Sequence, residues 1–300
     1  MLFILLLAIV YYLGTLGVPD LSIPAFNLPD FNFDLPNFFA RGQDHTVADG
    51  EIMVSFIDVG QGDSALIRCA NHAVLIDGGE HHARNAVMGY LREAGVTFID
   101  YVVATHPHSD HIGGLITVLR QMDVGAVIMP DVVHHTATFE RFLDVIDDRD
   151  IPVIFPTPGQ VIQAGLLNFT VLGPPTPHPG GDLNNASIVM RLAHGSTSFL
   201  FTGDAERPLE EWLISSGQNL TSNVLKVAHH GSRTSTIENF LYQVSPQAAV
   251  ISLGANNRYN HPHPEVIERL NNHHVRIYRT DQMGTIRMIT DGSDISLLRE

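Results

Sequence analysis

The sequence predicts an α/β fold in which two β-sheets pack face to face and helices cover their outer sides, giving a four-layer αββα sandwich. The body carries the same succession twice: three β-type runs, an aspartate at the end of the third run, and then a helical stretch. Such a unit cannot bury its apolar face alone, and stacking the two units buries both faces. A cluster of histidine and aspartate follows a further apolar run, which places a predicted site where the halves meet.

Residues 1–50 are predicted to precede this body. The apolar stretch over residues 2–18 contains no charged residue, and at about 17 residues it is short for a membrane span and lacks the basic start of an export signal. A signal anchor or a cleaved signal peptide over residues 1–18 is expected, with a buried helix as the alternative. Residues 19–50 combine four prolines with aspartate and phenylalanine, which predicts a linker. We therefore expect a membrane-anchored or secreted protein whose main domain, residues 51–300, lies outside the cytoplasm.

The first half of the body begins with three β-type runs. Residues 52–59, 64–70 and 73–79 are rich in β-branched and apolar residues and are separated by glycine or asparagine, as expected for strands joined by turns. The third run contains Asp77 at its end. A helical pattern over residues 83–94 follows and is closed by a glycine.

A metal-binding pattern follows the next apolar run, residues 98–103. Within six positions come His106, His108, Asp110 and His111. Imidazole and carboxylate are ligands of borderline divalent ions such as Zn²⁺ and Mn²⁺. On an extended segment residues i and i+2 point the same way, so His106 and His108 can bind one ion together. The other two side chains lie further on, where the chain turns, and a second, adjacent ion is therefore predicted.

The second half repeats the pattern with runs at residues 167–172, 187–192 and 198–204, the last of which ends at Asp204. A helical stretch over residues 208–214 follows, and its leading proline suits the first turn of a helix. The aspartates that end the third run of each half are expected to converge at the seam between the sheets.

Composition narrows the classes of function. The formal net charge is −15, with 32 acidic and 17 basic residues. This excludes binding of nucleic acid by a broad basic surface, which depends on neutralising phosphates with Lys and Arg. Any contact with nucleic acid has to be local. The single cysteine, Cys69, excludes an intramolecular disulfide and a cysteine-based zinc site.

Short motifs run in a fixed order through residues 51–291. They are D-V-G-Q-G-D-S-A-L-I (58–67), L-I-D-G-G (75–79), T-H-P-H-S-D-H-I-G-G-L (105–115), N-N-A-S-I-V-M-R-L (184–192), F-T-G-D (201–204), L-K-V-A-H-H-G-S-R-T-S-T (225–236), N-N-R-Y-N-H-P-H-P-E-V (256–266) and Y-R-T-D-Q-M-G-T-I (278–286). In this order they resemble the extracytoplasmic domain of the ComEC/Rec2 competence proteins, which belongs to the metallo-β-lactamase superfamily of binuclear metallohydrolases. The resemblance implies the metallo-β-lactamase fold.

The resemblance also implies two divalent metal ions, zinc or manganese. His106 and His108 would hold the first ion, and Asp110 and His111 the second. Asp204 would bridge both ions, because a carboxylate can offer one oxygen to each. Asp110 is expected to take part in catalysis as well as in metal binding.

His229 and His230 stand at the end of a predicted strand, where successive side chains point to opposite sides. One of them is therefore expected to bind metal. The resemblance favours His230 on the second ion and leaves His229 either to contact the substrate or to support the metal ligands. Asp77 would orient a metal-binding histidine, as carboxylates beside metal sites do. The remaining histidines, among them His134, are expected at the surface.

Asn184 and Asn185 occupy the position at which many superfamily members supply a further histidine to the first metal. That ion would then have fewer protein ligands and exchange more readily, which makes Mn²⁺ as credible as Zn²⁺. Asn185 is expected to support the ligands from behind. His261 is expected to contact the leaving group or a phosphate oxygen, and Arg233 a phosphate.

Together these features predict a binuclear metal-dependent hydrolase, expected to be a phosphodiesterase or deoxyribonuclease acting outside the cytoplasm. DNA or another phosphodiester is the expected substrate, with the membrane and DNA-uptake proteins as expected partners. Hydrolysis of a small ester, such as a phosphocholine-type diester, a lactone or a β-lactam, uses the same kind of site and stays open. A non-catalytic, membrane-tethered component of DNA uptake is a further alternative.

Overall fold

The computed structural model describes residues 47–298, and every structural statement below concerns that range. The predicted signal segment, 1–18, and most of the predicted linker, 19–50, lie outside it. Within the described range, no helix combines the length and the apolar character that crossing a membrane requires.

The first sheet contains eight strands within residues 47–298 and is mixed. They are β1 (Ile52–Phe56), β2 (Ala65–Cys69), β3 (His72–Ile76), β4 (Phe98–Val103), β5 (Asp123–Ile128), β6 (Val153–Ile154), β14 (Ile286–Thr290) and β15 (Ile295–Leu298). Their order in space is β15-β14-β1-β2-β3-β4-β5-β6. Strands β3, β4 and β5 are parallel, so the loops that follow them emerge at one edge of the sheet.

The second sheet contains seven strands in the described part of the chain. They are β7 (Val161–Ala164), β8 (Leu167–Gly173), β9 (Val189–His194), β10 (Thr197–Phe201), β11 (Val224–Lys226), β12 (Ala248–Ile251) and β13 (Arg276–Arg279). Their order is β13-β12-β11-β10-β9-β8-β7. Strands β10 to β13 run parallel to one another, and the loops after them also share one edge.

Helices follow the strands of each sheet. Those after strands of the first sheet are η1 (His81–Ala83), α2 (Arg84–Glu93), α3 (Ser109–Ile112), α4 (Leu115–Gln121) and α5 (Ala137–Asp148). Those after strands of the second are η2 (Leu183–Ala186), α6 (Arg207–Ser215), η3 (Ala228–Gly231), α7 (Glu238–Val244), α8 (Pro264–Asn272) and α9 (Thr280–Met283).

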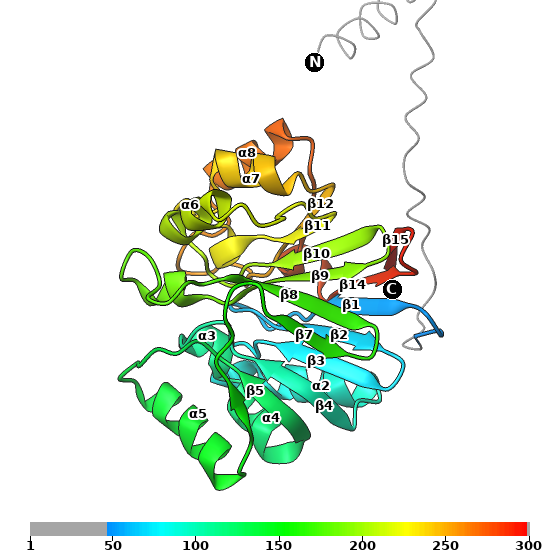
Figure 1. Ribbon diagram of the computed structural model, residues 1–300, viewed down its shortest axis with the longest axis vertical. Helices are drawn as coiled ribbons and strands as arrows, with labels where there is room; N and C mark the ends of the chain where they lie inside the picture. The colour runs from blue at the N-terminus through cyan, green and yellow to red at the C-terminus, as the bar shows by residue number, and fades with distance from the viewer. Residues whose placement is uncertain (1–46, 299–300) are drawn as a thin grey trace, which may run out of the picture. The chain divides into compact units, whose positions relative to one another are not determined.

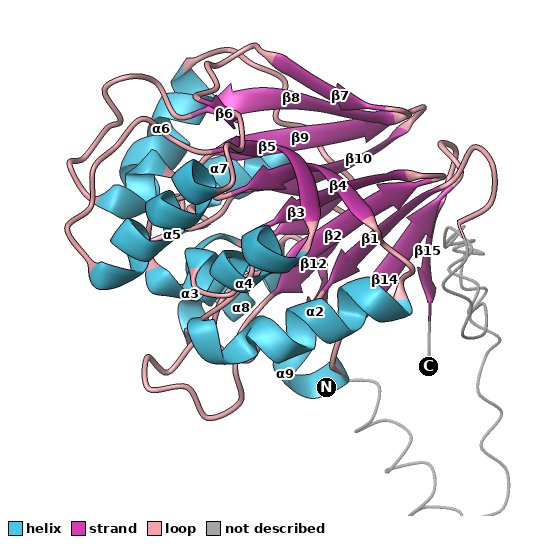
Figure 2. Cartoon of the chain, turned by 90° about the horizontal axis from the view of Figure 1, so that it is seen from below, coloured by secondary structure: helices cyan, strands magenta, loops and turns pink. Residues whose placement is uncertain are grey.

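The layers of the sandwich follow from side-chain alternation along the strands. In β10, Phe199 and Phe201 face the core between the sheets, whereas Leu200 faces the helices of the second half. The rings of Phe56 and Phe201 join the two sheets, with centroids 6.0 Å apart. Helices α2, α4 and α5 cover one side and α6, α7 and α8 the other (Figure 1). Figure 2 shows α2 and α4 lying across the strands of the first sheet. The predicted four-layer sandwich is confirmed.

The two halves are less alike than the repetition suggests. All six repeated runs form strands, β1 to β3 and β8 to β10, as predicted. The C-terminal strands β14 and β15, however, join the first sheet, where β14 pairs antiparallel with β1 and aligns Ile52 with Thr290. Without this pairing β1 would be an edge strand with unpaired backbone groups. The first sheet is therefore assembled from both ends of the described chain.

Candidate metal centre

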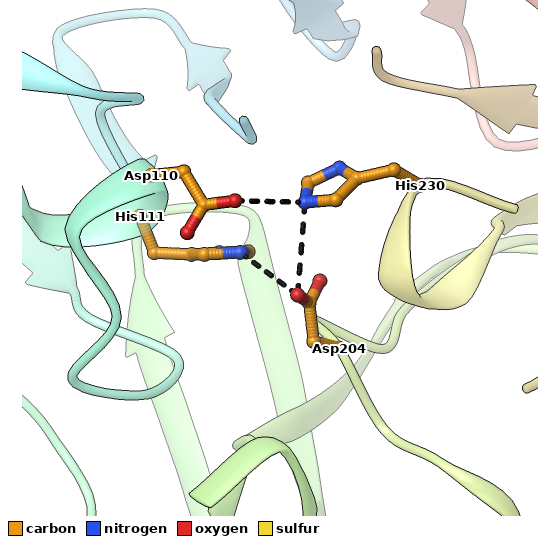
Figure 3. Close-up of side chains that lie close together, drawn as sticks. All are labelled: Asp110, His111, Asp204 and His230. Carbon is orange, nitrogen blue, oxygen red and sulfur yellow. Dashed lines mark ion pairs between the residues drawn. The ribbon is translucent and has the colours of Figure 1, made fainter. Parts of the chain in front are cut away.

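The histidine and aspartate motif emerges from the carboxyl end of β4. His106 and His111 are completely buried, and Asp110 and His111 lie on α3, a single helical turn. Figure 3 shows the side chains of this turn facing Asp204, which follows β10, and His230, which lies in η3. The predicted turn after the extended H-x-H segment is present.

Asp110, His111, Asp204 and His230 form one tight group. Each offers a ligand atom, and these atoms lie within 4.8 Å of one another. His111 Nε2 lies 3.2 Å from Asp204 Oδ2, while His230 Nε2 lies 3.3 Å from Asp110 Oδ2 and 3.6 Å from Asp204 Oδ2 (Figure 3). This is the set predicted for the second metal.

The pair predicted for the first metal lies beside this group. His106 Nε2 is 3.0 Å from His108 Nδ1 and 3.8 Å from Asp204 Oδ2. The same carboxylate oxygen, Asp204 Oδ2, therefore lies within 4 Å of both histidine sets: His106 of the first set, which also includes His108, and His111 and His230 of the second. That position suits the predicted bridging role of Asp204.

The donor set fits divalent ions. His111 Nε2, His230 Nε2 and Asp204 Oδ1 are buried and have no hydrogen-bond partner. Buried polar atoms normally have hydrogen-bond partners. The lack of partners for these three atoms therefore indicates a position for a bound group. Imidazole nitrogen and carboxylate oxygen are the donors that zinc and manganese take.

The charges in the site oppose one another strongly. Burial lowers the pKa of His230, but Asp204 and Asp63 outweigh it and raise that pKa to about 10. Burial raises the pKa of Asp204, yet His111 and His230 bring it well below its ordinary value. Burial, together with the charge of His111, lowers the pKa of His106 well below its ordinary value. At pH 7, His106 is therefore in the neutral form that binds metal, whereas His230 has to release a proton when an ion binds.

Asp77 makes the contact predicted for an orienting carboxylate. Its Oδ2 lies 2.8 Å from His111 Nδ1, which leaves His111 Nε2 directed toward Asp204. The backbone N–H of Thr105 donates to Asp77 Oδ1 at 2.8 Å, and the Thr105 hydroxyl donates to Asp77 Oδ2 at 2.7 Å. The imidazole of His111 is thereby held in one orientation.

The prediction that His229 and His230 point to opposite sides is wrong. Strand β11 ends at Lys226, and both histidines adopt left-handed backbone, with φ of 49° and 53°. His229 Nε2 lies 3.8 Å from Asp204 Oδ2, so both rings approach the same carboxylate. The chain had left the strand before the tandem, and the alternation rule no longer applied. His230 Nδ1 lies 2.9 Å from the carbonyl oxygen of Ser252, which fixes its ring.

Asp63 and Lys226 lie beneath the centre, and the sequence analysis gave neither a role. Both are buried and form a direct ion pair. Asp63 Oδ1 lies 3.3 Å from His230 Nδ1, and its backbone N–H donates to the carbonyl oxygen of Asp110 at 3.1 Å. Two features of the sequence could have indicated these residues. One is the D-V-G-Q-G-D motif, which ends at Asp63, and the other is the chain's single lysine, which lies three residues before His229.

Asn185 and Arg233 make contacts that the sequence did not predict. Asn185 Oδ1 accepts the backbone N–H groups of Glu206 and Leu209, both at 3.2 Å, and so caps α6. Its carbonyl oxygen is thus occupied at the helix start, where unpaired N–H groups need an acceptor. Arg233 is exposed and lies 3.8 Å from Glu265. The roles proposed for these two side chains gain no support from these contacts.

A cavity of about 420 Å³ opens above the ligands. Its lining residues are Gln61, His108, Ser109, Asp110, His134, Thr136, Thr138, Asn184, Asp204, His229, His230, Tyr259 and His261. His261, expected to contact the substrate, lies in the wall of this cavity. His134, expected at the surface, lies in the wall beside His108, with ring centroids 5.7 Å apart. Asn184 also lines the cavity, and its buried Oδ1 has no hydrogen-bond partner.

Comparison with known proteins places the chain in a family. The family model of the Metallo-beta-lactamase superfamily matches residues 57–255. The chain is 34% identical over 252 residues to ComE operon protein 3 of Bacillus subtilis (strain 168), covering 78% of this chain and 32% of that protein. It is 33% identical over 255 residues to Competence protein ComA of Neisseria gonorrhoeae, covering 83% and 34% respectively. The chain spans about a third of the length of these relatives.

Solved structures support the fold. The metallo-beta-lactamase fold protein YhfI from Bacillus subtilis matches with a TM-score of 0.55 and 14% identity over 79% of this chain and 99% of its own. A diphosphatase from the PhnP family matches with a TM-score of 0.50 and 14% identity over 82% and 99%. By its family match and its relatives, the chain belongs to the metallo-beta-lactamase superfamily and is a relative of the ComEC-type competence proteins, as its motifs predicted.

Proposed function

We propose that this protein is a binuclear metal-dependent phosphodiesterase that cleaves DNA. The position of Asp204 carries the proposal: one of its carboxylate oxygens lies within 4 Å of imidazoles from both histidine sets, at the floor of an open cavity. Two divalent ions, when bound, supply a nucleophile at neutral pH and stabilise the charge that develops on a phosphoryl group.

Residues of the chain would hold the reacting groups in place. His106 and His108 would bind one ion and Asp110, His111 and His230 the other, with Asp204 between them. Asp77 keeps the imidazole of His111 in one orientation. A fixed first coordination shell matters because small displacements of reacting groups are costly in rate.

His229 and His261 are the proposed contacts to the substrate. Both line the cavity, and their ring centroids are 5.6 Å apart. Burial, together with the charges of His230 and His229, lowers the pKa of His261 to about 4. At neutral pH His261 is therefore uncharged and can donate a hydrogen bond to a phosphate oxygen or to the leaving group through one nitrogen.

The choice of DNA rests on the relatives. One of them is named Competence protein ComA and another ComE operon protein 3. A third match, 30% identical over 240 residues, is Recombination protein 2 of Haemophilus influenzae. We further propose that the protein acts outside the cytoplasm, tethered or released through its N-terminal segment, alongside DNA-uptake proteins.

Cleavage assays with the purified full chain test this function. Single- and double-stranded DNA are incubated with Mn²⁺, Zn²⁺, Mg²⁺ or EDTA, beside the double variant Asp110→Ala/His111→Ala. We expect metal-dependent cleavage that the double variant loses by at least a hundredfold, because it removes two ligands of one ion. Bound metal is measured separately by elemental analysis.

Two results would overturn the proposal. If metal-loaded protein hydrolyses bis-p-nitrophenyl phosphate but does not cleave DNA, the substrate is a small ester and not DNA. Bound metal with no hydrolysis of any diester would indicate a non-catalytic component.

A further inference from the structure

We infer that Tyr259 and Arg258 form a subsite at the mouth of the cavity that binds one unstacked nucleotide of the substrate. Tyr259 would stack on the base, and Arg258 would contact the adjoining phosphate. This inference rests on the proposed function and specifies the form of DNA that the site accepts: a single strand.

The loop that carries these residues is firmly built. Asn257 Oδ1 accepts the backbone N–H groups of Tyr259 at 3.2 Å and of His261 at 2.9 Å. Its Nδ2 donates to the carbonyl oxygens of Gly254 at 3.0 Å and of His261 at 2.7 Å. Four hydrogen bonds from one side chain therefore fix where the tyrosine stands relative to the centre.

Tyr259 offers an aromatic surface to the cavity. The residue lines the cavity, yet 44% of its surface is exposed. Its ring lies nearly parallel to that of His261, with an interplanar angle of 23° and centroids 5.6 Å apart. His261 in turn approaches the ring of His229. A row of rings thus leads from the proposed metal ligands to solvent.

Arg258 adds a guanidinium beside Tyr259, at the edge of the cavity. None of the residues lining this cavity in the described chain is a lysine or an arginine. The Arg258 guanidinium donates to the Tyr259 hydroxyl at 2.7 Å and lies 4.9 Å from the ring centroid. The guanidinium is otherwise open to solvent. Its hydrogen bond to Tyr259, together with the negative charges of Glu80 and Asp110, raises its pKa. Its exposed side is open to a phosphate that approaches from solvent.

This pairing suits a single nucleic-acid strand. Proteins bind single strands by stacking bases on aromatic rings while cations follow the backbone, and every base has a face that can stack. A base inside a duplex already has neighbours on both faces and has to leave the stack first. The subsite therefore predicts a preference for single-stranded DNA with little dependence on sequence.

Substitution of the tyrosine tests the subsite. Cleavage of a single-stranded oligonucleotide is compared for the wild type, Tyr259→Ala, Tyr259→Phe and the control Tyr242→Ala, which alters another exposed tyrosine on α7. We expect Tyr259→Ala to raise KM about tenfold, the size of one lost stacking contact. Tyr259→Phe should stay within about threefold of the wild type, since it keeps the ring.

An abasic oligonucleotide shows whether the ring meets a base. Removing the base beside the cleaved bond should raise KM for the wild type, and the difference between wild type and Tyr259→Ala should then fall to about twofold. An equal loss on both oligonucleotides would overturn the inference, because it would mean that the ring only supports His261. No loss in Tyr259→Ala would overturn it too.

Failure of the proposed function looks different. A wild type that hydrolyses bis-p-nitrophenyl phosphate but no oligonucleotide would overturn the nuclease proposal and this subsite together. Fluorescence anisotropy in EDTA, with a labelled single strand, adds a readout that needs no cleavage. Binding weakened about tenfold by Tyr259→Ala supports the subsite, and unchanged binding counts against it.

Discussion

The carboxylate of Asp63 connects the two halves of the site from below. It pairs with Lys226 at the end of β11, and its backbone binds the first half through the carbonyl oxygen of Asp110 and the N–H of Gly79. Burial opposes ionisation of Asp63, but Lys226 and then His230 lower the pKa of the carboxyl. The Asp63 carboxylate therefore stays charged in the interior, where a buried charge without its partner would be costly.

Breaking this pair should destabilise the fold. We expect Asp63→Asn or Lys226→Met alone to lower the free energy of unfolding by about 3–5 kcal/mol, because each leaves a buried charge without its partner. The loss of unfolding free energy in the double variant should be smaller than the sum of the losses in the two single variants, by at least about 1.5 kcal/mol. Urea unfolding in EDTA measures all four proteins. Strictly additive losses would show that the two charges are not coupled.

Local spacing explains which site residues could be predicted. His106, His108 and the two residues on α3 lie within six positions, so chain geometry alone brings them together. Asp63 and Lys226 meet only because the two sheets stack in one particular way, and no spacing rule encodes that. The contacts of Asn185 depend on how η2 packs against the start of α6, about twenty residues further on, and no spacing rule encodes that either.

At the scale of elements, the junction between α3 and α4 holds the metal motif against the first sheet. A Cβ atom at Gly114 would lie 1.9 Å from the carbonyl oxygen of Gly78, just beyond β3. The backbone also bonds across this contact, from Gly78 N–H to the His111 carbonyl oxygen at 2.7 Å. The turn after the ligands can approach the strand end this closely only without a side chain.

Adding one methyl group at Gly114 should destabilise the fold strongly. We expect Gly114→Ala to cost about 3 kcal/mol in the free energy of unfolding, because both clashing groups are backbone and neither can rotate away. Gly89→Ala, in the middle of α2 with open space around it, is the matched control and should stabilise by about 0.5–1 kcal/mol. Urea unfolding compares them. A Gly114→Ala protein within 1 kcal/mol of the wild type would contradict the packing described.

Element identity was easier to predict than element partnership. The repeated runs are rich in β-branched residues and are buried on both faces in the sandwich, so they read as continuous apolar stretches. Which sheet β14 and β15 join depends on which sheet edge is still unpaired. The sequence of these two strands does not encode that.

At the scale of the whole molecule, the proposed ligands come from both sheets. His106 to His111 follow β4 of the first sheet, whereas Asp204 follows β10 and His230 follows β11 of the second. An ion bound there would link the halves, and the unfolded chain would not present the same set. Metal binding should therefore stabilise the folded chain.

Thermal unfolding measures this link. With Zn²⁺ or Mn²⁺ at about 100 times its Kd, we expect about 2.7 kcal/mol of added stability and a rise in Tm of about 5–10 °C. Asp204→Asn, which lacks the central carboxylate, should lose most of that rise. An undiminished rise in the variant would mean that the metal binds elsewhere, for instance at surface histidines.

The pairing of β1 with β14 also sets an order of events during synthesis. Ile52 leaves the ribosome long before its partner Thr290, so the first sheet keeps an open edge until nearly all of the described chain has been made. Contacts between such distant segments form late and slowly. The nascent protein therefore cannot complete its first sheet until translation has passed residue 290.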